Sequence, residues 1–177
     1  MGLCILGIFV GISTFKNLFY PEAYQDIVHK YALENELDEC LVMSVIKTES
    51  NFVPDAYSGK ASGLMQLTDA TAAWVCERVN IDVDKIDLYN PRDNIKLGCY
   101  YLKYLIDIYD GNTDVALAAY NAGPGKVNAW LEDKRYSLNG VDLLYIPYKE
   151  TREYIIKVNE QWKRYTNLYE KNKEEEK

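Results

Sequence analysis

The sequence of 177 residues contains a single histidine, His29, and four cysteines that lie far apart, at positions 4, 40, 76 and 99. A histidine-based metal site, a Ser-His-Asp triad or a Cys-His pair would each need His29, and no partner motif surrounds it. The cysteines have neither metal-ligand spacing nor the density of a disulfide scaffold, although a disulfide between two of the last three stays open. The sequence therefore offers no metal site, and we expect a structural role for His29.

Positive charge is also scarce, with 20 Lys and Arg against 27 Asp and Glu and a net charge of -7. No basic block with interleaved aromatic residues occurs, so nucleic-acid binding is disfavoured. Phenylalanine is rare (4) beside 16 tyrosines, whose flat faces and hydroxyls suit contact with sugars, although most of them will simply border the core. Length and composition, with 48% hydrophobic residues, indicate one globular domain.

No stretch shows convincing period-2 alternation, and no helical repeat is visible. Helical spacing of apolar residues, capping residues and Gly or Pro breaks instead predict an all-α fold of several short helices. The expected helices cover residues 21–35, 39 to shortly after 49, 70–79, 91–109, 115–121, 127–131 and 147–169. Residues 134–144 are expected to form a surface loop.

The first 15 residues carry no charged side chain and include an apolar run over residues 3–12. The run is similar to the core of a signal peptide or membrane anchor, but it is shorter than the ~20 residues that a spanning helix needs. Either the assigned start clips a longer anchor or the segment is a short uncleaved signal-anchor; a third possibility is an N-terminal core helix. We expect a signal or anchor segment over 1–19, one domain over 20–168 and a charged tail over 169–177.

Glu49 continues the apolar face of the helix that carries Leu41 and Val45, and it lies in the last turn. A helix C-terminus carries partial negative charge and apolar neighbours disfavour ionisation, so both effects raise a carboxyl pKa. Such a group can stay protonated near neutral pH and act as a general acid. The alternative is an ordinary solvated glutamate, which is the commoner case for a helical acid.

Three further segments place polar side chains at helix ends or in loops. Gly63-Leu64-Met65-Gln66 combines a conformationally free glycine with an adaptable thioether and an amide that can bind a sugar. Tyr120-Asn121 closes an alanine-rich helix before Gly123-Pro124, and Glu150-Thr151-Arg152 with Tyr154 opens the last helix. Each segment alone has a capping or packing explanation.

Together, Glu49-Ser50 and these three segments occur in the order seen in soluble lytic transglycosylases. The chain from about residue 20 to 165 resembles the lysozyme-like catalytic domain of that family, which cleaves peptidoglycan. The resemblance implies that Glu49 is the catalytic acid/base. It also implies that Arg152 is a structural anchor rather than a substrate contact. The substrate-binding residues that it implies around a glycan cleft are Ser50, Ser58, Ser62, Met65, Gln66, Tyr120, Asn121, Glu150 and Tyr154.

Glycosidases ordinarily use two carboxylates, but the nearest acid after Glu49 is Asp55, and no aspartate occupies an obvious nucleophile position. The resemblance implies a lyase in which Glu49 protonates the bond between N-acetylmuramic acid and N-acetylglucosamine and then accepts the C6 hydroxyl proton. The product is a 1,6-anhydro end, formed without metal or organic cofactor. Two alternatives are a hydrolytic muramidase, with Asp55 or another acid activating water, and a non-catalytic wall-binding module.

The substrate that the resemblance implies lies outside the cytoplasmic membrane. We therefore expect an extracytoplasmic protein that is tethered to the membrane by its N-terminal segment, or secreted if that segment is cleaved. Its expected partners are the glycan strands of peptidoglycan and the membrane. The sequence does not determine the oligomeric state, and a monomer is the simplest expectation.

Overall fold

The computed structural model describes residues 24–175, and their regular elements are all helical. Within these residues, β-type pairing is limited to two isolated bridges, Tyr57 with Ser62 and Ser62 with Leu67. The all-α prediction is therefore confirmed for the described part of the chain. The elements are α2 (Gln25–Glu34), α3 (Glu39–Ser50), α4 (Asp69–Arg78), the 3-10 helix η2 (Val83–Lys85), α5 (Pro91–Ile108), α6 (Thr113–Ala122), α7 (Pro124–Glu132) and α8 (Lys149–Glu175).

Local capping explains where α3 begins and ends. The Asp38 carboxylate accepts hydrogen bonds from the backbone N–H groups of Cys40 (2.7 Å) and Leu41 (3.3 Å), as expected for an N-cap. At the other end Asn51 adopts a left-handed conformation (φ 52°), which stops the helix directly after Ser50. Glu49 is therefore fixed in the last turn, as the sequence predicts.

The structure differs from the predicted helices at three places. The helix after Gly123 starts at Pro124 instead of residue 127, because proline suits the first helical position. Between the predicted helices 70–79 and 91–109, the structure has the short 3-10 helix η2. The last helix continues to Glu175, so the predicted charged tail is helical through most of its length.

The predicted N-terminal anchor lies outside the described residues. Within residues 24–175, none of the helices has both the length and the apolar character that a membrane span needs.

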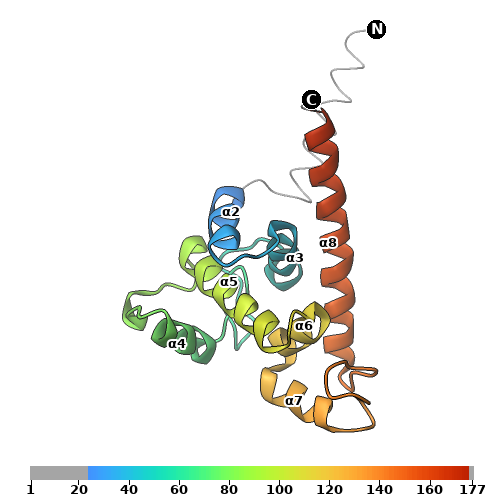
Figure 1. The fold of residues 1–177 in the computed structure, drawn as a ribbon. Coiled ribbons are helices and arrows are strands. Elements are labelled where there is room, and N and C mark those ends of the chain that lie inside the picture. The colour runs from blue at the N-terminus through green and yellow to red at the C-terminus, as the bar shows by residue number, and fades with distance from the viewer. Residues whose placement is uncertain (1–23, 176–177) are drawn as a thin grey trace.

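Helix α8 runs along one side of the molecule and packs against α3 and α6, whereas α5 contacts α2, α4 and α6 (Figure 1). The side chains enclosed between these helices form the main core, which includes Val42, Ile46, Leu102, Leu117 and Val158. A smaller core lies under α4 and joins it to α5 through Val75, Cys76 and Leu97. Both cores are apolar, so burial of these side chains is the main source of fold stability.

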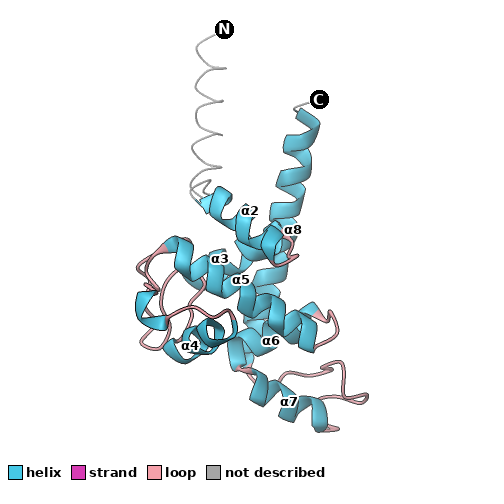
Figure 2. Ribbon diagram, turned by 60° about the vertical axis from the view of Figure 1, so that its left-hand side comes forward, coloured by secondary structure: helices cyan, strands magenta, loops and turns pink. Residues whose placement is uncertain are grey.

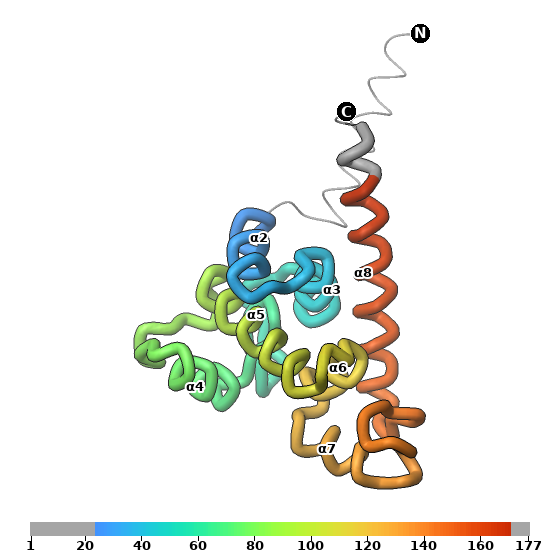
Figure 3. Tube along the Cα trace, in the orientation of Figure 1, coloured from blue at the N-terminus to red at the C-terminus, as the bar shows by residue number. Residues whose placement is uncertain are grey.

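Two long loops complete the structure, one between α3 and α4 and the other between α7 and α8 (Figure 2). The tube drawing shows that the α7–α8 loop lies next to the N-terminal end of α8 (Figure 3). The residues named as candidates therefore come from the C-terminal ends of α3 and α6, the N-terminal turns of α8 and the loop after α3.

Candidate active site

The Glu49 carboxyl lies where the last turn of α3 packs against α8, and the residue is partly buried. Burial raises the pKa of this carboxyl from 4.5 to about 7. A hydrogen-bonding interaction with the Tyr154 hydroxyl opposes the rise in pKa, and the negative charge of Glu150 adds to it. At neutral pH a large fraction of Glu49 is thus protonated and able to donate a proton.

Tyr154 belongs to α8 and is only 6% exposed. Its hydroxyl is buried, and it interacts with Glu49 outside the ordinary geometry of a hydrogen bond. The side chain therefore has little free surface, and its expected contact with substrate stays a prediction. Burial raises the pKa of the Tyr154 hydroxyl well above 10, so a neutral hydroxyl interacts with the Glu49 carboxyl group.

The Met65 side chain is completely buried, and its expected place in a sugar subsite stays a prediction. The cause of the burial is close packing on α5: a Cβ added at Gly98 would lie 2.3 Å from the Met65 sulfur. The polar contacts of Met65 are made by its backbone. Its carbonyl oxygen accepts a hydrogen bond of 2.8 Å from the Tyr120 hydroxyl, and its N–H donates to Asn94.

Asn94 on α5 is a buried polar residue that the sequence reasoning did not single out. Its Oδ1 accepts from the Met65 N–H (2.7 Å), and its Nδ2 donates to the carbonyl oxygens of Ser62 and Leu88 (both 2.9 Å). This one amide thus satisfies three backbone groups that would otherwise be buried without partners. It fixes the loop segment 62–65 against α5.

The same approach of the loop to α5 explains Gly63, whose φ of 78° favours glycine. A Cβ at this position would lie 2.1 Å from the Leu88 carbonyl oxygen and 2.3 Å from Asn94 Nδ2. Glycine is therefore required by both conformation and space. Gln66 follows with a positive φ of 47°, and its Nε2 donates to the carbonyl oxygens of Ala56 (3.1 Å) and Gly63 (2.9 Å). Its amide oxygen stays available as an acceptor.

The predicted serines lie in three different settings. The Ser50 hydroxyl donates back to the Ile46 carbonyl oxygen (3.2 Å), within its own helix. Ser58 is exposed and closes a tight turn with Ala61. Ser62 is 8% exposed and contacts the Tyr89 hydroxyl at 3.5 Å. Ser58 and Ser62 therefore support the loop between α3 and α4, whereas Ser50 bonds within α3, and Ser58 is the most exposed of the three.

Tyr120 and Asn121 end α6, and each is held by a different partner. Besides its bond to Met65, the Tyr120 ring lies 5.5 Å from the ring of Tyr101, and the phenol interacts electrostatically with Glu49. Burial raises the pKa of Tyr120 well above 10, so the phenol stays neutral. Asn121 is partly buried, and its Oδ1 accepts a hydrogen bond of 2.8 Å from the Thr151 hydroxyl on α8. Thr151 is the second residue that sequence reasoning missed.

Glu150 is exposed in the first turn of α8 and is the carboxylate whose charge acts on Glu49. Arg152 has the structural role expected of it, since its Nη1 donates to the Ile146 carbonyl oxygen and its guanidinium lies over the Tyr145 ring. Asp55 is exposed in the loop after α3. Of the predicted residues, Tyr120, Glu150 and Tyr154 therefore interact with Glu49, from the end of α6 and the first turns of α8.

The histidine and the cysteines lie outside this site. His29 is on the surface, where its Nδ1 lies 2.6 Å from Glu39. Cys40, Cys76 and Cys99 are free thiols, so no disulfide joins them. Among residues 24–175, no group of three or more His, Cys, Asp or Glu side chains could hold a metal ion.

The chain was compared with known protein families and structures. Residues 26–140 match the family model described as the transglycosylase SLT domain. The soluble lytic murein transglycosylase of Escherichia coli K12 is 34% identical over 140 residues, which are 77% of this chain and 22% of that protein. The membrane-bound lytic murein transglycosylase C of Histophilus somni is 32% identical, over 81% of this chain and 46% of that protein.

The X-ray structure of the lytic transglycosylase Slt of Pseudomonas aeruginosa, an inactive mutant with a glutamate replaced by glutamine, superposes with a TM-score of 0.76. It is 31% identical and covers 88% of this chain and 26% of that chain. The chain thus spans between about a fifth and a half of the length of these relatives. Since the family model matches more than half of it and the fold agrees, the chain belongs to the transglycosylase SLT domain family.

Proposed function

We propose that this chain is a peptidoglycan lytic transglycosylase in which Glu49 is the only catalytic carboxyl group. The observation that carries the proposal is the partly buried Glu49 with its pKa raised to about 7, at the point where three family motifs meet. Its relatives are named lytic murein transglycosylases, and the Pseudomonas protein is inactive with a glutamate replaced by glutamine. The names support the transglycosylase activity, and the inactive mutant supports an essential glutamate.

The proposed reaction has two proton transfers. Protonated Glu49 donates its proton to the glycosidic oxygen between N-acetylmuramic acid and N-acetylglucosamine as the bond from C1 to that oxygen breaks. The resulting carboxylate then accepts the proton of the C6 hydroxyl of the same muramic residue, while the C6 oxygen bonds to C1. Glu49 is protonated again at the end, and no water is consumed. A pKa near neutrality suits both steps, because neither protonation state is strongly disfavoured.

The arrangement of carboxylates supports the lyase over a hydrolase. A hydrolytic mechanism needs a second carboxylate to activate water or to act as nucleophile. Asp55 is exposed in its loop and does not contribute to the raised pKa of Glu49, whereas Glu150 does contribute but is itself exposed. Solvent exposure leaves Glu150 suited to contact glycan at the edge of the site.

The substrate-binding part of the proposal rests on the accessible polar groups. The Gln66 amide oxygen, the Asn121 Nδ2, the Ser58 hydroxyl and Glu150 have free hydrogen-bonding capacity toward glycan.

Membrane anchoring through residues 1–19 and an extracytoplasmic location are also proposals. The membrane-bound relative supports the anchoring by its name, whereas the other relative is called soluble.

The proposal is tested by comparing Glu49→Gln with Glu160→Gln, an exposed glutamate on α8, in the full chain. Purified sacculi are incubated with each protein, and released muropeptides are separated and weighed by mass spectrometry. The expected result is loss of anhydro-muropeptide release in Glu49→Gln and normal release in Glu160→Gln. Release of anhydro-muropeptides by Glu49→Gln would show that another group is the acid.

A further inference from the structure

The hydroxyl of Thr151 is hydrogen-bonded to a residue of a neighbouring helix. The residue lies in the first turn of α8 and is 1% exposed. A threonine inside a helix often donates to the carbonyl oxygen four residues earlier, as Thr166 does to Trp162 at 2.9 Å in the same helix. For Thr151 that position is Pro147, which precedes the helix. Its hydroxyl donates instead to Asn121 Oδ1 on α6, at 2.8 Å.

This hydrogen bond determines the orientation of the Asn121 amide. The oxygen and the NH2 group of an amide have nearly the same shape, so their hydrogen-bond partners decide which way they point. If the amide were reversed, the Thr151 hydroxyl would have to accept the bond, and its own hydrogen, on a residue that is 1% exposed, would need a different acceptor. The observed orientation commits Oδ1 to Thr151. It leaves Nδ2, with two N–H donors, free of other hydrogen bonds to described residues.

The side-chain amide of Gln66 uses its NH2 group, and not its oxygen, for hydrogen bonds within the protein. Gln66 uses its Nε2 in bonds to Ala56 and Gly63, so its oxygen is the free group. Tyr120 connects the two regions, because it precedes Asn121 and bonds to the carbonyl of Met65, which precedes Gln66. The site therefore presents an amide donor from α6 and an amide acceptor from the loop. The acetamido groups of the glycan offer the complementary pair, a carbonyl oxygen and an N–H.

We propose that Thr151 is a positioning residue that holds Asn121 so that Nδ2 donates a hydrogen bond to an acetamido carbonyl oxygen of the glycan. The inference rests on the proposed function and concerns its substrate specificity. Thr151 does not contact the substrate itself. It acts by preventing reversal of the amide, and the site then favours N-acetylated sugars over their free amines.

The test uses Thr151→Val, which keeps the shape and removes the hydroxyl, in a Glu49→Gln background that does not cleave. Thr151→Ser restores the hydroxyl, and Thr166→Val makes the same change elsewhere in α8. Affinity is measured by calorimetry for two probes, N-acetylated chitotetraose and its de-N-acetylated form. The readout is the ratio of the two affinities, which a general loss of stability does not change. Thermal unfolding of each variant is recorded alongside.

We expect Thr151→Val to lower the affinity ratio about fivefold, the effect of one ordinary hydrogen bond. Thr151→Ser and Thr166→Val should keep the parental ratio, and Asn121→Ala should lower it no further when added to Thr151→Val. A parental ratio in Thr151→Val, or an equal loss in Thr166→Val, would overturn the inference while leaving the proposed function intact. A parent that binds neither probe, together with a wild-type protein that releases no anhydro-muropeptides, would overturn the proposed function as well.

Discussion

The hydroxyl of Tyr120 donates a 2.8 Å hydrogen bond to the carbonyl oxygen of Met65, and this bond joins the end of α6 to the loop segment before α4. Tyr120 also interacts electrostatically with Glu49, which lies on α3. The tyrosine thus connects three parts of the site that are far apart in the sequence. Its position explains how a loop without regular structure is held near the Glu49 carboxyl.

Tyr120→Phe should keep the ring contact with Tyr101 and lose the bond to Met65. The Met65 carbonyl would then lack its partner, so we expect the free energy of unfolding to fall by about 1 kcal/mol. We also expect a lower rate of sacculus cleavage, because the loop is no longer fixed. Urea unfolding followed by circular dichroism measures the first effect, and muropeptide release the second. An unchanged unfolding free energy would contradict this role of the bond.

Gly63→Ala should be far more damaging than Gly59→Ala, although both glycines have positive φ values (78° and 86°). The new methyl at Gly63 would collide with the Leu88 carbonyl and with Asn94, whereas the space around Gly59 is open. We expect a loss of about 1 kcal/mol for Gly59→Ala and more than about 3 kcal/mol for Gly63→Ala. Thermal or urea unfolding compares them directly. Equal losses would mean that only backbone conformation, and not packing on α5, restricts Gly63.

The helix ends could be predicted from the sequence because their causes are local. Asp38 lies one residue before α3 and caps it, and Asn51 takes the left-handed conformation that ends it. The position of Glu49 in the last turn follows from these two signals. The motif order then indicated which helix ends belong to one site. Local patterns and the family resemblance were sufficient for that part.

The contacts across the site could not be predicted in the same way. Asn94 and Thr151 look like ordinary polar residues in helices, and their partners Met65 and Asn121 lie 29 and 30 residues away. Met65 and Tyr154 were expected, from the family resemblance, to contact the substrate. Packing against Gly98 and Glu49, which depends on how α5 and α3 are placed, buries them. Tertiary packing rather than local sequence determines the contacts and the burial of these four residues.

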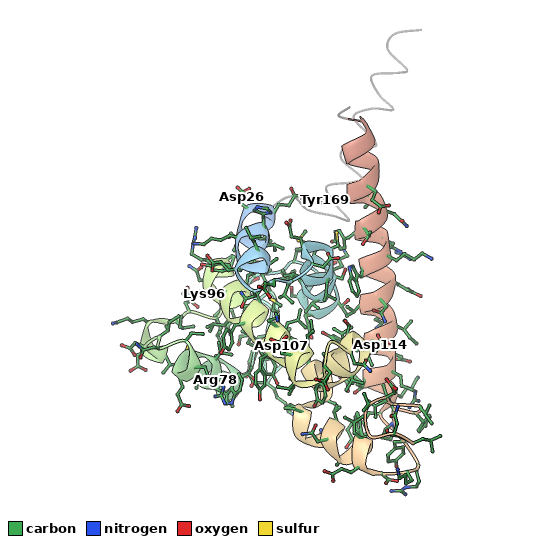
Figure 4. The ribbon with its side chains drawn as sticks, in the orientation of Figure 1. Asp26, Arg78, Lys96, Asp107, Asp114 and Tyr169 are labelled. Carbon is green, nitrogen blue, oxygen red and sulfur yellow. The ribbon has the colours of Figure 1, made fainter. Side chains whose placement is uncertain are left out.

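Asn94→Ala should destabilise the protein strongly, because Met65 N–H and the carbonyl oxygens of Ser62 and Leu88 all lose their partner. We expect a fall in unfolding free energy of about 3 kcal/mol. The control is Asn159→Ala, which removes a surface bond of 2.8 Å to Asp114; Figure 4 shows Asp114 next to α8. That change should remain within about 1 kcal/mol. A similar small effect for Asn94→Ala would show that the loop does not depend on it.

The raised pKa of Glu49 predicts a specific pH dependence of stability. Its pKa is about 7 in the folded protein and 4.5 ordinarily, so the folded state binds the proton more tightly. The group therefore lowers stability as pH rises from about 4.5 to 7, and the full penalty is present above 7. Glu49→Gln removes the penalty. Its unfolding free energy relative to wild type should increase by about 1 to 3 kcal/mol between pH 5 and 8. A pH-independent difference would contradict the raised pKa.

The pH dependence of cleavage should depend on the same group. Because Glu49 must be protonated to act as an acid, kcat/KM should fall as pH rises above about 7. Glu150→Gln removes a negative charge that raises this pKa, so the fall should begin at lower pH. Glu160→Gln, which changes an exposed glutamate farther along α8, should leave the profile unchanged. Identical profiles for Glu150→Gln and wild type would exclude an electrostatic role for Glu150.

The central claim is that one carboxyl group serves as acid and then as base, with the substrate's own C6 hydroxyl in place of water. Digestion of sacculi in water enriched in a heavy oxygen isotope, followed by mass spectrometry of the muropeptides, tests it most directly. The account predicts anhydro-muropeptides that are one water lighter than hydrolytic products and contain no heavy oxygen. Full-mass products labelled at the new reducing end would show instead that the enzyme is a hydrolase.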